Sequence, residues 1–188
     1  MHLIETMSAS TGLKIDKPFI QTEEIDLPKK PYITFHPEHN KGTRRLYTKW
    51  VDVVKNLTGY DLVQIGNRDG VKYEDYGVNT DYLEKININQ LAYLIKHAEL
   101  HLGYDSFPIH LASYFNVKIV GLWSLYTSHS YPYFSDANDY IMLEPDYDKL
   151  GLKPVYTDND KFRLIDKIKP SDIVDSVNRL MKNNVESR

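Results

Sequence analysis

Short apolar segments alternate with amphipathic segments from residue 32 to the end of the chain, and this alternation constrains the fold more than any other feature of the sequence. Apolar runs at 32–35, 61–66, 100–104 and 118–123 predict strands, and helical spacing of apolar residues at 50–57, 90–98, 108–115 and 171–182 predicts helices. We therefore expect an α/β fold, an open and mostly parallel sheet with helices on both faces. Ligands of such sheets bind at the carboxyl ends of the strands, here the loops after Phe35, Ile65, Tyr104 and Trp123.

The length of 188 residues predicts one domain with a substantial core. Residues 1–30 show no sustained periodicity, and the sequence Leu-Pro-Lys-Lys-Pro at 27–31 favours an extended connector because each proline restricts the backbone. We expect residues 1–30 to form a lead-in arm and residues 31–188 to form the domain.

Charge and composition exclude several classes of function. The chain carries 23 Lys and Arg against 26 Asp and Glu, a net charge of −3, so it has no general field that attracts nucleic acid. It has no cysteine, which excludes disulfides, thiolate nucleophiles and cysteine-ligated metals. No long apolar window or basic leader is present, which predicts a cytoplasmic protein without a membrane span.

The segment 102–112 is the most informative part of the sequence. It places Asp105 and Ser106 where a predicted strand ends, Pro108 at the start of a predicted helix, and His110 in the first helical turn. Free backbone N–H groups and the helix dipole make such a place suitable for an anion. Asp105 is expected to orient these amides or bind a ligand hydroxyl, and Ser106 and His110 to donate to phosphate or sugar. The alternative is that Asp105 or Ser106 only caps the helix and that His110 is an ordinary half-buried histidine.

A second cluster, residues 36–50, follows the first predicted strand and concentrates positive charge in an acidic protein. Its basic residues are Lys41, Arg44, Arg45 and Lys49, which suit a diphosphate, although a solvated run of charge is the alternative. His36, Glu38 and His39 lack a further ligand at a recognisable spacing, so we expect no metal site. Neither a G-x-G-x-x-G fingerprint nor a P-loop occurs.

Together these clusters resemble the C-terminal, nucleotide-sugar-binding half of GT-B glycosyltransferases of the heptosyltransferase family, family 9. Lys49 and Trp50 resemble the family's Lys-Trp helix start, and Gly-Tyr-Asp-Ser-Phe-Pro-Ile-His-Leu-Ala at 103–112 resembles its Gly-Asn/Thr-Asp-Ser/Thr-Gly-Pro-x-His-Leu-Ala segment. The helix at 90–98, the strand at 117–123 and the connector-like residues 2–13 also fall where the family has them. The resemblance covers nearly the whole chain and implies a single Rossmann-like domain.

The resemblance also implies a function, the metal-independent, inverting transfer of a sugar from a nucleotide diphosphate donor with no cofactor. In that picture Lys49 and Asp105 are the catalytic residues. Lys49 neutralises the diphosphate leaving group, and Asp105 holds the donor together with Ser106 at the helix N-terminus. The further donor-binding residues are His36, Arg44, Arg45, Asn67 and His110. Two positions depart from the family pattern. Phe107 replaces a glycine, where its ring would either crowd the donor or stack on it, and Lys49 directly precedes Trp50 without an intervening residue.

A whole GT-B enzyme has a second half that holds the acceptor pocket and the catalytic base. We therefore expect a homo-oligomer or a partner subunit to complete the cleft, with the apolar helix stripe at 173–181 and the ring-rich segment 123–134 as candidate contact surfaces. The rings of 123–134 are equally compatible with stacking on a ligand or with packing onto the protein body. A non-catalytic nucleotide or nucleotide-sugar binding protein is the alternative function, and an epimerase-like fragment is a third.

Overall fold

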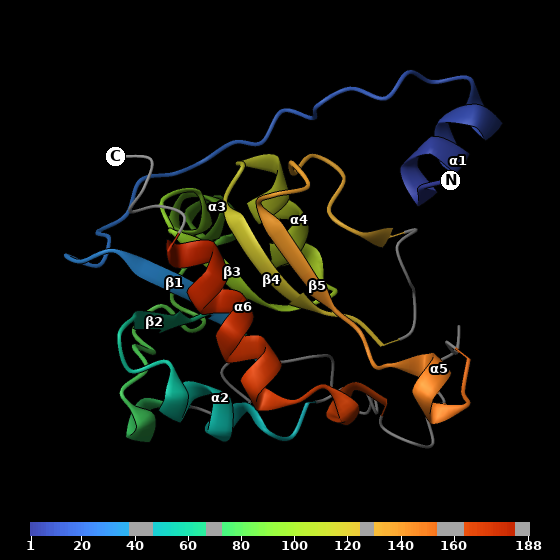
Figure 1. Ribbon diagram of the computed structural model, residues 1–188. Helices are drawn as coiled ribbons and strands as arrows, with labels where there is room; N and C mark the ends of the chain where they lie inside the picture. The colour runs from blue at the N-terminus through green and yellow to red at the C-terminus, as the bar shows by residue number, and fades with distance from the viewer. Residues whose placement is uncertain (38–46, 67–72, 125–129, 154–163, 183–188) are drawn as a thin grey trace.

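The computed structural model describes residues 1–37, 47–66, 73–124, 130–153 and 164–182. Its centre is one sheet of five parallel strands: β1 (Tyr32–His36), β2 (Asp61–Gln64), β3 (Leu100–Tyr104), β4 (Lys118–Leu122) and β5 (Tyr140–Leu143). The strand order is β2-β1-β3-β4-β5 (Figure 1). The predicted parallel α/β architecture is therefore confirmed.

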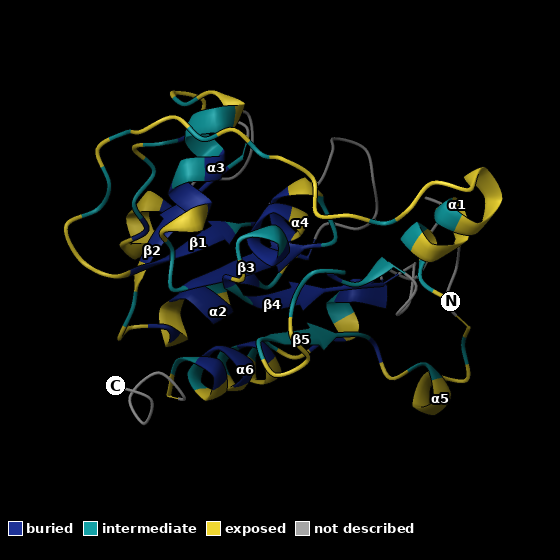
Figure 2. Cartoon of the chain, turned by 90° about the horizontal axis from the view of Figure 1, so that it is seen from above, coloured by how far each residue is buried: buried dark blue, intermediate teal, exposed yellow. Residues whose placement is uncertain are grey.

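Helices cover both faces of this sheet. Helices α2 (Trp50–Asn56) and α6 (Pro170–Lys182) pack together on one face, and α3 (Ile88–Lys96) and α4 (Phe107–Tyr114) pack together on the other. Figure 2 shows the buried strands between these two helical layers. Side chains alternate across β1, so that Ile33 and Phe35 join the core under α2 and α6, while Tyr32 joins the core under α3 and α4.

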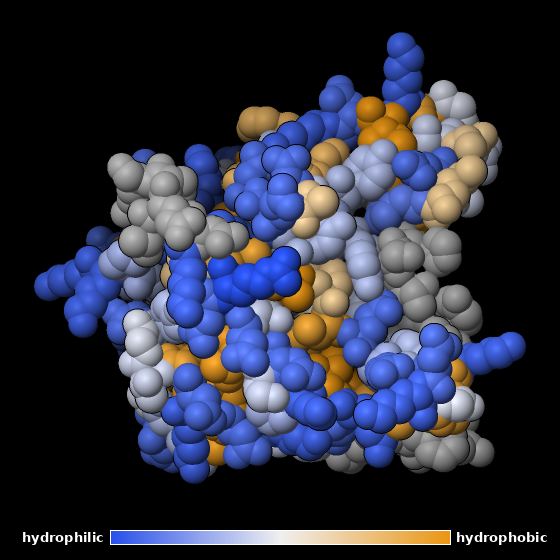
Figure 3. Space-filling view, in the orientation of Figure 1, coloured by the Kyte–Doolittle hydropathy of each residue, from blue (hydrophilic) through white to orange (hydrophobic). Residues whose placement is uncertain are grey.

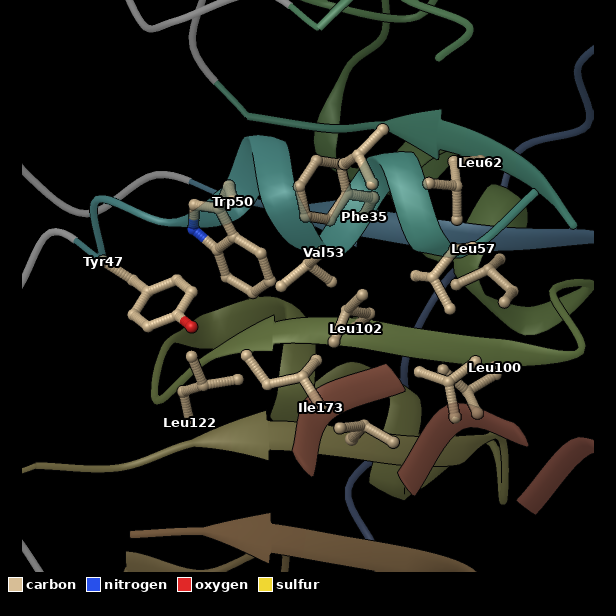
Figure 4. Close-up of a cluster of buried hydrophobic side chains, with 14 of the residues drawn as sticks. Phe35, Tyr47, Trp50, Val53, Leu57, Leu62, Leu100, Leu102, Leu122 and Ile173 are labelled. Atoms are coloured by element: carbon tan, nitrogen blue, oxygen red, sulfur yellow. The ribbon is translucent and has the colours of Figure 1, made fainter. Parts of the chain in front are cut away.

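The core under α2 and α6 is rich in aromatic rings. The Trp50 ring contacts Phe35 at 5.0 Å, Tyr47 at 5.1 Å and Tyr104 at 5.5 Å between ring centroids, each edge to face. Figure 4 shows Tyr47 and Trp50 side by side at the start of α2. This cluster fixes the first turn of α2 against the carboxyl end of β3, which matters for the site described below.

Helix α6 corrects one prediction about partner surfaces. Its residues Ile173, Val177 and Leu180 are buried against the protein's own sheet, at 0%, 0% and 2% exposure. The predicted helix is present, but its apolar stripe completes the core and is not a contact surface for another chain, so that part of the prediction is wrong.

Helix α3 begins where the sequence predicts, because Asn87 caps it. The Asn87 side chain accepts hydrogen bonds from the backbone N–H groups of Asn89 and Gln90, at 2.9 and 3.0 Å. The Gln90 side chain in turn accepts from the Asn87 N–H at 2.9 Å, which completes a capping box.

The structure contains several elements that the sequence did not predict. They are the helices α1 (Leu3–Thr11) and α5 (Tyr147–Leu150), the edge strand β5, and the short 3-10 helices η1 (Glu74–Tyr76) and η3 (Leu164–Lys167). Helix α1 buries none of its residues, so no apolar periodicity marks it, and its cap is His2, an unusual residue for that position. Strand β5 is an edge strand whose four residues are only partly buried. Figure 3 shows apolar residues at the surface near α1, where Leu3 and Met7 are half exposed.

Between α1 and β1 the chain runs without helix or strand and crosses the start of α3 (Figure 1). Its contacts centre on Glu23, whose N–H donates to the Asn89 carbonyl at 3.1 Å and whose carboxylate accepts from Asn87 and Gln90. The partly buried Ile20, Ile25 and Leu27 pack on the core beneath α3 and α4. In the described part of the chain, no helix has the length and apolar character needed to cross a bilayer.

Candidate functional site

The strand order reverses direction between β1 and β3, which makes the carboxyl ends of these two strands the switch point of the sheet. From β1 the chain passes through α2 to β2 on one side, and from β3 it passes through α4 to β4 on the other. Helices α2 and α4 lie on opposite faces, so the helices that follow β1 and β3 pack on different sides of the sheet. Open α/β sheets bind ligands at such a switch point.

Two predicted donor-binding residues meet at this switch point. His36 is the last residue of β1 and pairs across the sheet with Gly103 of β3. The His36 Nδ1 atom lies 3.1 Å from the hydroxyl of Ser106, which itself donates to the Tyr104 carbonyl at 3.3 Å. Because the serine hydroxyl has a single hydrogen, this arrangement fits an Nδ1–H of His36 that donates to the Ser106 oxygen.

Ser106 occupies the N-cap position of α4 without capping the helix through its side chain. Its backbone is extended, with φ −161° and ψ 172°, and its hydroxyl makes no cap hydrogen bond. Of the two interpretations left open by the sequence, simple side-chain capping by Ser106 is therefore wrong. The positive end of this eight-residue helix lies at the switch point with no Ser106 side-chain cap on its N–H groups, which suits an anion.

Asp105 and His110 lie together beside this helix start. Asp105 Oδ1 is 3.9 Å from His110 Nε2, and the side chains are 24% and 47% exposed. Burial lowers the pKa of His110, and its electrostatic interaction with His2 lowers it further. His110 is therefore neutral near pH 7, and it contacts Asp105 as a polar neighbour more than as a full ion pair.

Phe107 is the first residue of α4 and its ring is 52% exposed. Among the described residues other than glycine, only Glu84 and Asn116 have a positive φ. Position 107 thus has ordinary helical backbone, and a glycine is not required there for conformational reasons. The exposed ring leaves stacking on a ligand open as the function of this residue.

Lys49, the predicted diphosphate ligand, is the residue immediately before α2, at the same carboxyl edge of the sheet. Its side chain is partly buried, and its Nζ atom donates to the backbone carbonyl of Asp166 at 2.6 Å. The predicted Arg44, Arg45 and Asn67 fall outside the described residues, as do Lys41, Glu38 and His39.

A buried polar pair under the site was missed by the sequence-based prediction. His101 is fully buried, its Nδ1 atom lies 3.0 Å from the Thr34 hydroxyl, and burial lowers its pKa to about 3, with a smaller contribution from His36. The signal in the sequence is a histidine inside an otherwise apolar strand. A Cβ atom on Gly103 would lie 3.1 Å from His101 Nε2, from His36 Cβ and from the His36 carbonyl oxygen, so glycine leaves room for the His101 ring and for the end of β1.

The ring-rich segment that follows β4 divides between core and surface. Trp123 is 1% exposed, packs in the core beneath α3 and α4, and donates from Nε1 to Ser130 Oγ at 3.0 Å. Tyr131 packs on Trp123, with 5.5 Å between ring centroids, and its carbonyl oxygen lies 2.7 Å from His2 Nε2. Packing onto the body is therefore the function of the Trp123 ring, while residues 125–129 fall outside the described part of the chain.

No metal centre emerges from the described residues. Within those ranges, no three His, Asp or Glu side chains gather in a way that would hold an ion. Metal independence stays a prediction, because residues 38–46 lie outside the described part of the chain.

Comparison with known proteins identifies the family. The profile of glycosyltransferase family 9 (heptosyltransferase) matches residues 4–145. A search of curated protein sequences gives no significant match.

The solved structures that resemble this chain include family 9 glycosyltransferases and heptosyltransferases. A family 9 glycosyltransferase from Veillonella parvula superposes with a TM-score of 0.62 and 17% identity over 95% of this chain. The E. coli ADP-heptose LPS heptosyltransferase II gives a TM-score of 0.59 and 17% identity over 83% of this chain. The dodecameric iron-containing heptosyltransferase TibC of enterotoxigenic E. coli, in complex with ADP-D-β-D-heptose, gives 0.59 and 16% over 89%.

This chain covers only 50%, 48% and 49% of these three structures, respectively. It therefore spans about half the length of the proteins whose fold it shares. At these levels of identity the similarity shows the fold, and it agrees with the Rossmann-like domain of GT-B type expected from the sequence.

Proposed function

The chain belongs to glycosyltransferase family 9, the heptosyltransferase family, and from this premise we propose that the switch point between β1 and β3 binds the nucleotide diphosphate sugar donor of a glycosyl transfer. The diphosphate lies at the start of α4, where His36, Ser106 and the helix N–H groups converge. Lys49 approaches the same diphosphate from the start of α2. Asp105 and His110 bind hydroxyl or phosphate oxygens beside it.

One observation carries this proposal, the contact between His36 and Ser106 across the point where the strand order reverses. The contact joins the ends of β1 and β3 and draws the Ser106 hydroxyl away from the helix that it precedes. The positive end of α4 thus remains for an anionic ligand.

The proposed reaction breaks the bond between the sugar C1 atom and the diphosphate oxygen. The bonding electrons leave with the nucleoside diphosphate, while the acceptor oxygen attacks C1 from the opposite side and inverts its configuration. Lys49 and the α4 amides stabilise the negative charge that develops on the leaving group, which is the function a metal ion otherwise serves. The acceptor proton passes to a base outside this half of the cleft, so no base is assigned within the described residues.

The similar TibC structure contains ADP-D-β-D-heptose, which makes an ADP-linked heptose the first donor to test. A panel of ADP, GDP, UDP and CDP, each titrated by calorimetry beside its nucleoside, identifies the nucleotide. Lys49→Ala should weaken diphosphate binding about tenfold or more and leave nucleoside binding unchanged, because a charge-assisted contact is worth about 1.5–3 kcal/mol.

The matched control for this variant is Lys96→Ala. Lys96 is an exposed lysine in the last turn of α3, and that end of the helix lies at the amino edge of the sheet, away from the switch point. Equal losses for nucleoside and diphosphate in Lys49→Ala would remove Lys49 from the diphosphate site.

The second half of the cleft is proposed to come from another chain, from a second copy of this one, or from further sequence joined to it. A lone half should bind donor and transfer little, because closure of two halves excludes water and positions the acceptor. Light scattering and a mass-based transfer assay on one sample test this. A strict monomer with robust multiple turnover would place acceptor site and base within these residues.

Non-catalytic binding of a nucleotide or nucleotide sugar is the second candidate. Product formation by the completed assembly, detected by mass, would exclude it. A cytoplasmic location remains a prediction from the sequence.

A further inference from the structure

Residues 47–49, which immediately precede α2, are held by a carboxylate far along the chain. Asp166 lies in η3, and its Oδ1 atom accepts the Thr48 N–H at 2.8 Å across a separation of 118 residues. Its Oδ2 atom accepts the Thr48 hydroxyl at 3.0 Å. Both oxygens of Asp166 therefore bind the residue next to Lys49.

The Lys49 ammonium is bound by the same residue in a different way. Its Nζ atom donates to the backbone carbonyl of Asp166 at 2.6 Å, and Lys49 forms no ion pair within the described ranges. A carbonyl is a neutral acceptor, so this bond orients the ammonium without cancelling its charge. The positive charge is held in place and is still available to an anionic ligand.

The other side of residues 47–49 is tied to the end of β3. The buried Tyr104 hydroxyl accepts the Tyr47 N–H at 2.6 Å and the Trp50 indole N–H at 2.8 Å. The Tyr47 hydroxyl donates to the Ile168 carbonyl at 3.1 Å. The backbone at Lys49 is thus fixed both to β3, which leads into Asp105, and to the chain around Asp166.

From these contacts we infer that Asp166 is a positioning residue, which holds Lys49 where its ammonium binds the diphosphate of the nucleotide sugar. The inference rests on the proposed function, and it adds a residue that lies beyond the 4–145 match to the family. Asp166 never touches the ligand. It acts by fixing Thr48 through its carboxylate and Lys49 through its carbonyl.

The sign of the effect separates positioning from simple electrostatics. Asp166 is a negative charge close to an expected anion site, so its removal would by charge alone strengthen diphosphate binding. Positioning predicts the reverse, a weaker diphosphate complex, because Thr48 and Lys49 lose the bonds that order them.

The test uses ADP and adenosine, titrated by calorimetry against the full chain. Asp166→Ala should weaken ADP binding about fivefold or more and leave adenosine unchanged, approaching the loss expected for the Lys49 contact itself. Asp166→Asn should stay within about twofold of the wild type, since its amide accepts the Thr48 N–H and donates to the Thr48 hydroxyl. Asp175→Ala removes an exposed carboxylate of α6 as the charge-matched control. In a Lys49→Ala background, Asp166→Ala should cause no further loss.

Unchanged or tighter ADP binding by Asp166→Ala, together with a loss in Lys49→Ala, would overturn the role of Asp166 and leave the proposed function standing. Absence of ADP binding by the wild type, or equal affinities for ADP in the wild type and Lys49→Ala, would refute the diphosphate site and the role of Asp166 with it. If Asp166→Ala does not fold, Thr48→Val, which removes one carboxylate bond at an exposed position, should weaken ADP about twofold to threefold. An unchanged affinity in Thr48→Val would then contradict the inference.

Discussion

Replacement of Tyr104 by phenylalanine removes a single oxygen that two buried groups depend on. The Tyr104 side chain is 1% exposed, and its hydroxyl accepts from the Tyr47 backbone N–H and from the Trp50 indole N–H, at 2.6 and 2.8 Å. Tyr47 and Trp50 are themselves 1% and 0% exposed, so water does not reach these donors. Burial also raises the pKa of Tyr104, which keeps the hydroxyl protonated.

The expected cost follows from the two donors left without a partner. An unsatisfied buried donor costs about 1–3 kcal/mol, so Tyr104→Phe should lower the free energy of unfolding by about 2–6 kcal/mol. Urea unfolding followed by circular dichroism measures this loss from the shift in midpoint at constant slope.

The matched control is Tyr32→Phe, the same chemical change at another buried tyrosine. The Tyr32 hydroxyl donates to the Leu94 carbonyl at 2.7 Å, so the loss of this bond should cost about 1 kcal/mol. If Tyr104→Phe cost no more than Tyr32→Phe, the Tyr104 hydroxyl would not organise the start of α2, and the anchoring of Lys49 to β3 would be refuted.

The remaining predictions concern packing, pH and metal. Gly121→Ala should lower the free energy of unfolding by about 1–3 kcal/mol, because its Cβ would lie 2.6 Å from the Trp123 ring and 3.0 Å from Ile109. Gly59→Ala is the control: a Cβ there has nothing within 4 Å, so stability should change by under about 0.5 kcal/mol. Urea unfolding measures both. His101 has a pKa of about 3 in the folded protein against 6.5 as its ordinary value, so the unfolded state takes up a proton first as the pH falls below 6.5 and stability declines. Between pH 7 and pH 5 the wild type should therefore lose about 2 kcal/mol more stability than His101→Asn, and equal losses would contradict a buried neutral histidine. EDTA should leave ADP binding unchanged in calorimetry, while binding that disappears with EDTA and returns with Mg²⁺ would show that a metal supplies the charge assigned to Lys49.

The sequence predicts the fold well where apolar periodicity and turn chemistry agree. Strands β1 to β4 and helices α2, α3, α4 and α6 lie close to their predicted ranges because each buries a continuous face. Helix α1 and strand β5 bury too little to leave such a pattern, so no periodicity marks them.

The candidate site was predicted less completely, because its organisation depends on contacts between distant residues. The segment containing Asp105 and Ser106 carries local signals, a strand end and a helix start, and the structure places it at the switch point. The contact of Ser106 with His36 spans 70 residues, and that of Lys49 with Asp166 spans 117. No local pattern specifies such pairs, which arise only when the sheet order brings the strand ends together.

The most direct test of a donor site at the switch point is an NMR titration of the histidine rings with an ADP-linked sugar. His36 and His110 line the proposed site, and His97, an exposed residue at the end of α3, lies at the opposite edge of the sheet as an internal control. At saturation, the ring signals of His36 and His110 should shift while those of His97 stay in place. Binding detected by calorimetry with His36 and His110 unmoved, or with only His97 perturbed, would place the ligand elsewhere and contradict the account.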